Sequence, residues 1–599
     1  MKKFSVTLIA LLLSICTFAQ DPALAPFYHG VASGDALSDR VILWTRVTPD
    51  VPASLTVDWL IATDTLFTDI VNSGTTTTDS TKDYTVKVDA TGLQPDTWYY
   101  YIFKHEGENS LIGRTRTMPV GDNTHIRMAV ASCASIGSGD YFNAYLSIAR
   151  RNDIHAVVHL GDYMYEYAGG GLTGTGIPIL PNTETTTLDK YRQRYATYRL
   201  DPYLRRLHQQ YPFYTVWDDH ESANNSWEEG SNNHTPGVEG DWQVRKAEAK
   251  QANFEWLPRR EQAPGDYTIY RTFSIGNLAD LVMLDTRLEG RDEQATNSAG
   301  YQDTNRTILG TTQRAWLLDE LSGSQAKWKI IGQQVMFAPL IATTFTNDMW
   351  DGYEGDRNRI VNHVMNNNIE NVVVLTGDIH SSWANDVPQK GVSYNAGTGA
   401  GSAFVEFICS SITSGSGSFN LNAQTVQLLA PHVKYLDLTK RGYLVIDIDS
   451  NRAQSDWTYV SNIDNAVFTE STPVSWYVNK GERHVREASA PVTGYVNSAP
   501  FAPLNRDTTN VSVRETSNTL NVTVYPNPFG SAIFIRVNNL HEKNLVVRVY
   551  NVLGKLVKEK IVPSTPTISM DLSDLKQGAY LLTVAAGSAE FKSTIVKMQ

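Results

Sequence analysis

The sequence predicts an α/β fold with a small β-sandwich at each end of the chain. From Ile126 onward, short apolar runs alternate with stretches of helical spacing, which is the pattern of a sheet covered by helices. Before this region, and again after residue 521, alternating apolar and polar runs lie between turn residues, which is typical of β-sandwiches. A chain of 599 residues is too long for one hydrophobic core, so several domains are expected.

The overall composition indicates a folded protein that does not bind nucleic acid. Hydrophobic residues make up 41% of the chain and charged residues 19%, which is usual for globular proteins. The net charge of −12 argues against a nucleic-acid partner and against a basic membrane-surface protein. It does not exclude a small anionic substrate, because bound metal ions can reverse the local field.

Residues 1–19 have the pattern of an export signal. Two lysines precede an apolar run, and Thr17-Phe18-Ala19 resembles a cleavage site. No later stretch is long and apolar enough to span a membrane, so the mature protein is expected to have no transmembrane segment. The cysteines that remain after cleavage are Cys133 and Cys409, which leaves open one disulfide or a thiol held for metal binding.

A first β-sandwich, of the immunoglobulin or fibronectin type, is predicted over residues 22–118. Leu55–Leu60 and Tyr84–Asp89 alternate in the manner of half-buried strands. The segment Gly92–Tyr101 resembles the tyrosine corner of such sandwiches. A generic β-rich segment leading into the next domain is the alternative interpretation.

Residues 119–485 are predicted to form one large α/β domain. Six apolar runs are expected to be strands: 126–130, 155–160, 211–216, 278–284, 328–332 and 372–375. Helical spacing is expected over 141–151, 188–207, 241–261, 313–321 and 357–368.

The segment Val157–Tyr167 places an acid directly after a buried strand. Its apolar run breaks at Gly161, and Asp162 and then Tyr165 follow. The carboxyl end of such a strand is where open α/β sheets bind ligands. An ordinary Gly-Asp turn is the alternative for this segment taken by itself.

Further strand ends along the chain carry the same kinds of side chain. Because parallel strands end at one edge of a sheet, these side chains are expected to converge there on a metal site. In chain order they are Cys133, then Asp162 and Tyr165, then Asp219, His220 and Glu221, then Gln333 or Gln334, and finally Asp378 and His380.

The donor types divide into two candidate metal sites that share Asp162. Thiolate, phenolate and imidazole from Cys133, Tyr165 and His380 favour a strongly Lewis-acidic ion, and Fe(III) fits. The second set offers only oxygen ligands, which favours Ca²⁺ over Zn²⁺. Its members are Asp162, Asp219, Asp378, Asn224 or Asn225, and a glutamine amide from Gln333 or Gln334; which of Asp218 and Asp219 ligates is left open.

These strand ends resemble those of the calcineurin-like, or purple-acid-phosphatase-like, two-metal phosphoesterases. The chain departs from their pattern at Cys133, Asp219 and Asp378, which stand where an acid, an asparagine and a histidine are usual. With those departures, residues 27–460 resemble the alkaline phosphatase D (PhoD-type) family. The matching motifs are Gly30–Asp35, Val41–Arg46, Ala131–Cys133, Leu160–Glu166, Tyr191–Tyr195, Trp217–Glu221 with Asn224 and Asn225, Leu284–Arg287, Trp350–Tyr353 and Gly377–His380.

This resemblance implies a metallophosphoesterase β-sandwich flanked by helices, and an exported phosphoric ester hydrolase that uses iron and calcium. Hydroxide bound to the two metals is expected to attack phosphorus, with Asp162 as a bridging carboxylate. His220 is the candidate acid for the leaving group, with Glu221 as its orienting partner. Arg192, Arg194 and Arg287 are candidate phosphate ligands.

Two other functions remain open for the sequence. The same site chemistry would serve a phosphodiesterase or phospholipase-D-like hydrolase, acting on a small-molecule or polymeric phosphoester. A non-catalytic surface protein with structural metals is the second alternative, and the presence of His220 beside a full ligand set argues against it.

The last part of the chain is predicted to be a separate β-sandwich behind a linker. Residues 486–520 are rich in Ala, Pro, Ser, Thr and Asn, which suits a linker. Within residues 521–599, the motifs Val524–Pro528, Tyr550–Lys555 and Leu575–Tyr580 resemble the type IX secretion (Por) sorting domain. That resemblance implies a Bacteroidetes-type bacterium, handling by the type IX machinery, removal of this tail, and a secreted or cell-surface location.

Overall fold

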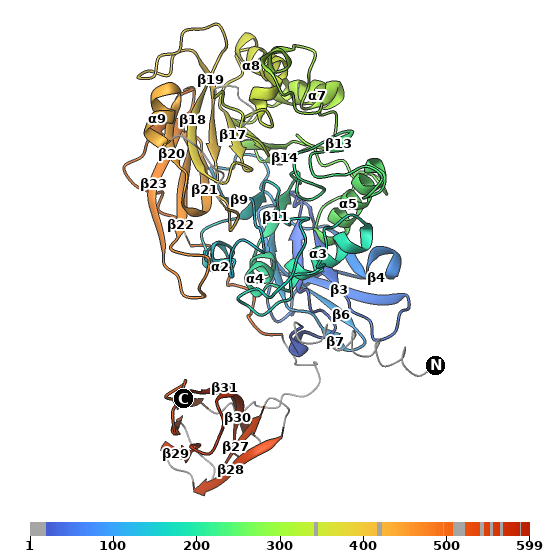
Figure 1. The fold of residues 1–599 in the computed structure, drawn as a ribbon, viewed down its shortest axis with the longest axis vertical. Helices are drawn as coiled ribbons and strands as arrows, with labels where there is room; N and C mark the ends of the chain where they lie inside the picture. The colour runs from blue at the N-terminus through green and yellow to red at the C-terminus, as the bar shows by residue number, and fades with distance from the viewer. Residues whose placement is uncertain are drawn as a thin grey trace. The chain divides into compact units, whose positions relative to one another are not determined.

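The computed structural model describes residues 20–340, 346–415, 422–494, 496–506, 521–538, 544–551, 555–563, 567–586 and 589–598. The expected export signal, residues 1–19, lies outside them. Among the described residues, no helix is both long and apolar enough to cross a membrane. The chain divides into two compact units, residues 1–508 and 509–599 (Figure 1).

The first unit is built on a ten-stranded mixed sheet. Its centre is the parallel run β9, β10, β11 and β1, and antiparallel strands extend it on both sides. In spatial order the strands are β24 (Arg486–Glu487), β23 (Glu470–Asn479), β22 (Arg452–Val460), β21 (Arg441–Asp449), β9 (His125–Ala131), β10 (Ala156–His159), β11 (Pro212–Thr215), β1 (Val31–Gly34), β2 (Arg40–Arg46) and β5 (Thr85–Thr91).

A second mixed sheet of seven strands contributes to the same apolar core. Strands β15, β16, β17 and β19 are parallel neighbours, so their carboxyl ends share one edge. Val158 and Leu160 from the first sheet belong to one buried cluster with Leu281 and Leu375 from the second. In spatial order this sheet contains β14 (Arg271–Ile275), β15 (Ala279–Met283), β16 (Trp328–Gln333), β17 (Val372–Thr376), β19 (Ser402–Ile408), β18 (Ser382–Pro388) and β20 (Val433–Asp437).

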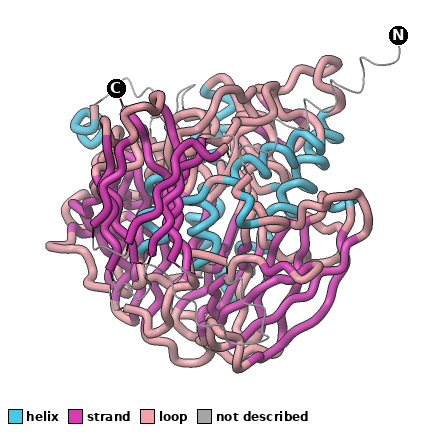
Figure 2. Tube along the Cα trace, turned by 90° about the horizontal axis from the view of Figure 1, so that it is seen from below, coloured by secondary structure: helices cyan, strands magenta, loops and turns pink. Residues whose placement is uncertain are grey.

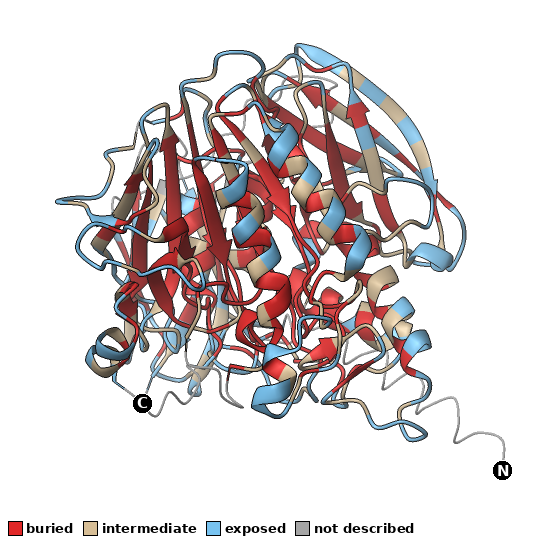
Figure 3. Cartoon of the chain, turned by 90° about the horizontal axis from the view of Figure 1, so that it is seen from above, coloured by how far each residue is buried: buried red, intermediate tan, exposed pale blue. Residues whose placement is uncertain are grey.

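Helices cover the sheets and show their polar sides to solvent, as the pale blue outer faces in Figure 3 indicate. Figure 2 shows the helices in cyan and the strands of the sheets in magenta. The long helix expected over residues 188–207 is two helices. Pro202 ends the first because it lacks a backbone N–H, and the Asp201 carboxylate caps the second by accepting from Tyr203 N and Leu204 N.

The other expected helices are confirmed with shifted ends. The α-helices are α2 (Asn143–Arg150), α3 (Leu188–Leu200), α4 (Pro202–Gln210), α5 (Trp242–Trp256), α6 (Ser298–Gln302), α7 (Gly310–Gly323), α8 (Glu354–Asn366) and α9 (Ala423–Leu429). Short elements are the 3-10 turns η1 (Pro22–Leu24), η2 (Ser80–Lys82) and η3 (Trp350–Tyr353) and the hairpin β12 (Ser226–Trp227) and β13 (Gly230–Ser231).

The N-terminal region is β-rich, as expected, but it shares its core with the rest of the unit. Its own sheet holds β3 (Leu55–Ala62), β4 (Ile70–Thr78), β6 (Trp98–His105), β7 (Glu108–Asn109) and β8 (Gly113–Arg116). The tyrosine corner is confirmed, because Tyr99 Oη accepts a hydrogen bond of 2.8 Å from Gln94 N. Strands β1, β2 and β5 also belong to the ten-stranded sheet, so this N-terminal β domain is continuous with the rest of the unit.

Part of the expected linker over residues 486–520 is an ordered strap that packs against the first unit. We call residues 488–494 and 496–506 the strap. Its Val492 N donates to buried Asp456 at 3.0 Å, and Arg127 donates to the Val492 carbonyl at 3.1 Å. Further on, Ala502 N donates to the side chain of buried Gln210 at 3.0 Å. The composition resembled a linker because the strap is held by long-range polar partners and lacks local periodicity.

The strap also contacts the N-terminal region. The Tyr100 hydroxyl donates to the Pro500 carbonyl at 2.6 Å, and fully buried Arg114 donates to the Ala499 carbonyl at 3.2 Å. Ala502 packs in one apolar cluster with Tyr100 and Ile102. The strap therefore belongs to the first unit.

The second unit is a β-sandwich, as predicted. One sheet contains β25 (Asn521–Tyr525), β26 (Ala532–Asn538) and β29 (Thr567–Asp571). The other contains β28 (Leu556–Pro563), β27 (Asn544–Asn551), β30 (Gly578–Ala586) and β31 (Ala589–Lys597). Inward residues such as Ile535, Val547 and Leu582 form its separate core.

Truncation of the chain before and after the strap tests whether the strap stabilises the first unit. A chain ending at Arg506 should unfold at the same temperature as the first unit of the full chain. A chain ending at Glu487 leaves Arg114, Arg127 and Gln210 buried without these partners, at a cost of about 1–3 kcal/mol for each group. Its unfolding midpoint, measured by calorimetry, should fall by about 5 °C or more. Equal midpoints for the two truncations would contradict a structural role of the strap.

Candidate metal centre

The predicted strand-end residues converge at one edge of the two sheets. Cys133 follows β9, Asp162 follows β10, Asp219 follows β11, and Asp378 and His380 follow β17. Four of these five have left-handed backbone conformations, with φ of 60°, 53°, 61° and 55° at Cys133, Asp162, Asp378 and His380. Such conformations cost about 1–3 kcal/mol each outside glycine and cluster at functional sites. The backbone therefore bends sharply where each side chain enters the site.

The first candidate site contains the thiol, the carboxylate and the imidazole that the sequence predicts. Ligand atoms of Cys133, Asp162 and His380 lie within 4.8 Å of one another. The Tyr165 hydroxyl lies 2.9 Å from Oδ2 of Asp162 and 3.1 Å from Nε2 of His380. The three-residue spacing between Asp162 and Tyr165 thus brings both side chains to one point.

Residues of the loop after β19 orient two of these donors. The Gly415 carbonyl accepts a hydrogen bond of 2.6 Å from Nδ1 of His380. A carbonyl cannot donate, so Nδ1 carries the proton and the lone pair of Nε2 faces Asp162 and Tyr165. Ser414 Oγ donates to the Cys133 carbonyl at 2.9 Å and lies within hydrogen-bond distance, 2.6 Å, of the Tyr165 hydroxyl. The imidazole therefore has the tautomer that a metal ligand needs.

The second candidate site is a group of carboxylates next to the first. Ligand atoms of Asp162, Asp219 and His220 lie within 4.8 Å of one another, and the same holds for Asp218, Asp219 and Asp378. The backbone N–H of Asn225 donates to Oδ2 of Asp219 at 2.6 Å. Asp162 and Asp219 thus link the two sites.

Arg287 neutralises part of this group. Its guanidinium donates to Asp218 at 2.5 Å, to Asp378 at 2.7 Å and to Asp348 at 2.6 Å, and is fully buried. Asp348 is in turn held by Arg291 at 2.5 Å. Arg287 was predicted to bind phosphate, and the structure places it at the site with its donors engaged by carboxylates.

Because the acidic side chains of the site are buried, their ionised forms are unfavourable unless further positive charge is present. Burial raises the pKa of Asp162 and of Asp378 to about 7. Burial opposes ionisation of Asp219 as well, but Arg287 and His220 outweigh it and lower its pKa. Burial, followed by the charge of Asp162, also raises the pKa of the Cys133 thiol and the Tyr165 phenol well above their ordinary values. These are donors that a bound cation would deprotonate.

His220 is oriented by Glu166, which corrects the assignment of that role to Glu221. Nδ1 of His220 lies 2.7 Å from Glu166 Oε2, and Nε2 lies 4.0 Å from Asp219 Oδ1. Burial opposes protonation, but Asp219, Glu166 and Asp162 together raise the His220 pKa well above its ordinary value.

Glu221 has a different task, which is to fix the turns that carry the ligands. Its carboxylate accepts from the backbone N–H groups of Asp162 at 3.0 Å, Tyr163 at 2.7 Å and Asp218 at 2.8 Å. It therefore ties the end of β10 to the end of β11.

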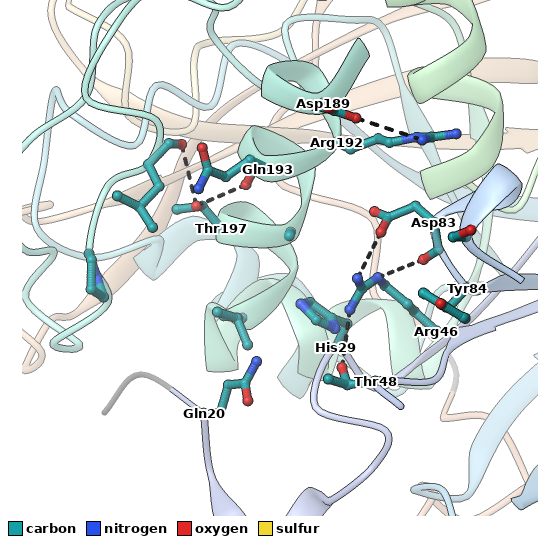
Figure 4. A pocket seen from close by; sticks show the side chains of 15 residues that line it. Gln20, His29, Arg46, Thr48, Asp83, Tyr84, Asp189, Arg192, Gln193 and Thr197 are labelled. Atoms are coloured by element: carbon teal, nitrogen blue, oxygen red, sulfur yellow. Dashed lines mark hydrogen bonds and ion pairs between the residues drawn. The ribbon is translucent and has the colours of Figure 1, made fainter. Parts of the chain in front are cut away.

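Two of the predicted arginines lie in structural roles away from the metal-binding atoms. Arg192 binds the Glu255 carboxylate at 2.6 Å and lines a crevice near Asp189 and Asp83 (Figure 4). Arg194 is buried and donates to the backbone carbonyls of Tyr165 and Tyr167. The Arg192 guanidinium is thus paired with Glu255, and its role in substrate binding stays a prediction.

The predicted amide ligands are also engaged elsewhere. Oε1 of Gln333 accepts from Trp350 at 3.1 Å, and its amide donates to Thr376 at 2.7 Å. Oε1 of Gln334 accepts from Thr286 at 2.7 Å. Asn224 N donates to Glu166 at 2.8 Å, so Asn224 stays close to His220 and remains a candidate through its side chain.

Sequence reasoning missed Glu166, Asp348 and Ser414. Glu166 lies within the motif that carries Asp162, and only its distance to His220 shows its role. Asp348 comes from a loop without strand-end spacing, so no local pattern could indicate it. Ser414 lies in the loop after β19, and a search for polar side chains past every strand end would have included it.

The donor set fits a pair of metal ions on evidence from the structure itself. Oδ1 of Asp162 and Oδ2 of Asp218 are buried and have no hydrogen-bond partner within the described part of the chain. Buried carboxylate oxygens of this kind need a positive partner. Both oxygens belong to residues of the two groups that could hold an ion.

Comparisons with known proteins agree with this geometry. Residues 128–457 match the PhoD-like phosphatase family, residues 14–119 match its N-terminal domain, and residues 523–598 match the secretion system C-terminal sorting domain. Alkaline phosphatase D of Bacillus subtilis (strain 168) is 36% identical over 496 residues, which cover 78% of this chain and 83% of the relative. A solved PhoD structure superposes with a TM-score of 0.71 at 34% identity, covering 79% of this chain and 94% of that one.

The sorting domain indicates handling by the type IX system and export to the cell surface or the extracellular space. The catalytic match spans more than half of the chain, and the curated relative is similar over most of its length. The chain therefore belongs to the PhoD-like phosphatase family and is a phosphoric ester hydrolase of the alkaline phosphatase D type.

Proposed function

We propose that this hydrolase acts through an iron site and a calcium site that share Asp162. The observation that carries the proposal is the convergence of Cys133, Asp162, Tyr165 and His380 within bonding reach of one point. Sulfur, phenolate and imidazole donors suit Fe(III). Asp162, Asp219 and Asp378 supply oxygen ligands for the second site, which suit Ca²⁺, and Asn224, whose N–H donates to Glu166, is the candidate amide ligand.

When bound, the two ions would supply an activated water and positive charge for the phosphoryl oxygens. The protein's own residues prepare the place for that chemistry. Glu221 holds the turns of Asp162 and Asp218 together, and Gly415 fixes the His380 tautomer. Arg287 keeps Asp218 and Asp378 in position and limits their mutual repulsion.

His220 is placed to protonate the leaving alkoxide. Glu166 accepts a hydrogen bond of 2.7 Å from Nδ1 of His220, so Nε2 faces the Asp162–Asp219 side of the site. Tyr165 stacks on the imidazole at 4.1 Å and fixes the plane of the ring. A protonated, oriented imidazole at the cluster is the arrangement that general acid catalysis requires.

Metal analysis of the purified protein tests the ligand assignment. We expect one iron per chain together with calcium. Cys133→Ala should lose most of the iron, because it removes the thiolate ligand. Cys409→Ala is the matched control, since Cys409 is equally buried and contacts Ser132 at 3.3 Å but is not in the cluster. Two zinc ions without iron, or a Cys133→Ala protein that keeps its iron, would contradict the assignment.

Leaving-group dependence tests the roles of His220 and Glu166. His220→Asn should lower kcat about 10²–10⁴-fold for alkyl phosphates, whose alkoxides need a proton. The loss should be much smaller for 4-nitrophenyl phosphate, whose leaving group needs none. Glu166→Gln should follow the same trend more weakly, and both variants should keep their metal content. Equal losses on both esters would exclude the acid role, and loss of metal from His220→Asn would make His220 a ligand instead.

A further inference from the structure

Tyr167 is a large aromatic side chain at the rim of the site that the mechanism above does not use. It is 44% exposed, whereas Tyr165 is 5% exposed and His220 7% exposed. Its ring meets the His220 imidazole edge to face, with centroids 5.1 Å apart and planes at 63°. His220 therefore contacts both the stacked ring of Tyr165 and the partly exposed ring of Tyr167, and the centroids of these two rings lie 6.3 Å apart.

The backbone of Tyr167 is held firmly for a residue at a loop surface. Arg194 Nη2 donates to the Tyr167 carbonyl at 2.7 Å and to the Pro181 carbonyl at 3.1 Å. The same guanidinium donates to the Tyr165 carbonyl, and Arg194 is only 2% exposed. A partly exposed ring on a backbone fixed by a buried arginine is preorganised to bind, because little conformational entropy is lost.

The proposed proton transfer from His220 puts the substrate's alcohol group beside the Tyr167 ring. If His220 protonates the leaving oxygen, the carbon skeleton bonded to that oxygen must lie next to the imidazole. The candidate ligands Cys133, Asp162 and Asp219 are buried, so that skeleton has to extend outward from the site. Tyr167 is the aromatic side chain that contacts His220 and is also open to solvent.

We propose that Tyr167 is a specificity-determining residue that contacts the organic half of the ester. It favours esters whose alcohol carries a ring or another flat apolar face. The inference rests on the proposed role of His220 for its geometry.

Two phosphoryl compounds with good leaving groups and different shapes test this proposal on the purified full chain. 4-Nitrophenyl phosphate is an aryl ester with an aromatic ring, and acetyl phosphate is a mixed anhydride whose leaving group is only acetate. Tyr167→Ala should raise KM for 4-nitrophenyl phosphate about three- to tenfold, which is the range of one lost aromatic contact. KM for acetyl phosphate should stay unchanged. Tyr167→Phe, which keeps the ring, should behave like the wild type.

A second measurement separates binding from chemistry. Calorimetric titration with phenylphosphonate and methylphosphonate should show weaker binding of the phenyl compound alone in Tyr167→Ala. Val120→Ala serves as a control, because Val120 is 59% exposed and precedes the start of β9, whereas Cys133 follows its end. Neither 4-nitrophenyl phosphate nor acetyl phosphate needs a proton on its leaving group. The difference between their KM changes is therefore independent of whether His220 is the acid. Equal changes for the ring-bearing and the small compounds, or no change for either, would overturn the proposal.

Discussion

The structure around the active site depends on how several carboxylates are held together in a buried place. Two like charges 4 Å apart repel by about 4 kcal/mol at the effective dielectric of a protein. At the sheet edge, carboxylate oxygens of Asp218, Asp219 and Asp378 lie within 4.8 Å of one another, and an oxygen of Asp162 lies within the same distance of Asp219. Arg287 alone supplies one positive charge to three of these carboxylates, through contacts to Asp218, Asp219 and Asp378. The remaining negative charge and the raised pKa values of Asp162 and Asp378 define a site built for cations.

The fold provides this arrangement by ending parallel strands of two sheets at one edge and turning the chain sharply there. Left-handed backbone at Cys133, Asp162, Asp378 and His380 directs each side chain into the site at an energetic cost. Glu221 and Ser414 hold these turns through hydrogen bonds to Asp162, Asp218 and Cys133. The deep apolar core beneath the turns, shown in red in Figure 3, stabilises the strained segments. The packing of the core thus supports the geometry of the candidate metal ligands at the sheet edge.

Much of the site could be predicted from the sequence, because each ligand follows an apolar strand directly. Cys133, Asp162, Tyr165, Asp219, Asp378 and His380 come together for that reason. The roles of arginines and amides could not be predicted, since Arg192, Arg194, Gln333 and Gln334 find partners far away in the chain. The same limit applies to the fold. The parallel pairing of β1 with β11 and the strap over Arg127 and Gln210 are long-range contacts without a local signature.

Anomalous diffraction at the iron absorption edge, from crystals of the purified protein, tests the central claim most directly. The account predicts one iron peak bonded to Cys133, Asp162, Tyr165 and His380. It also predicts a second ion without iron signal that shares Asp162 and lies against Asp219 and Asp378. An absence of metal beside Cys133, or an iron peak that Asp162 and Cys133 do not share, would contradict it.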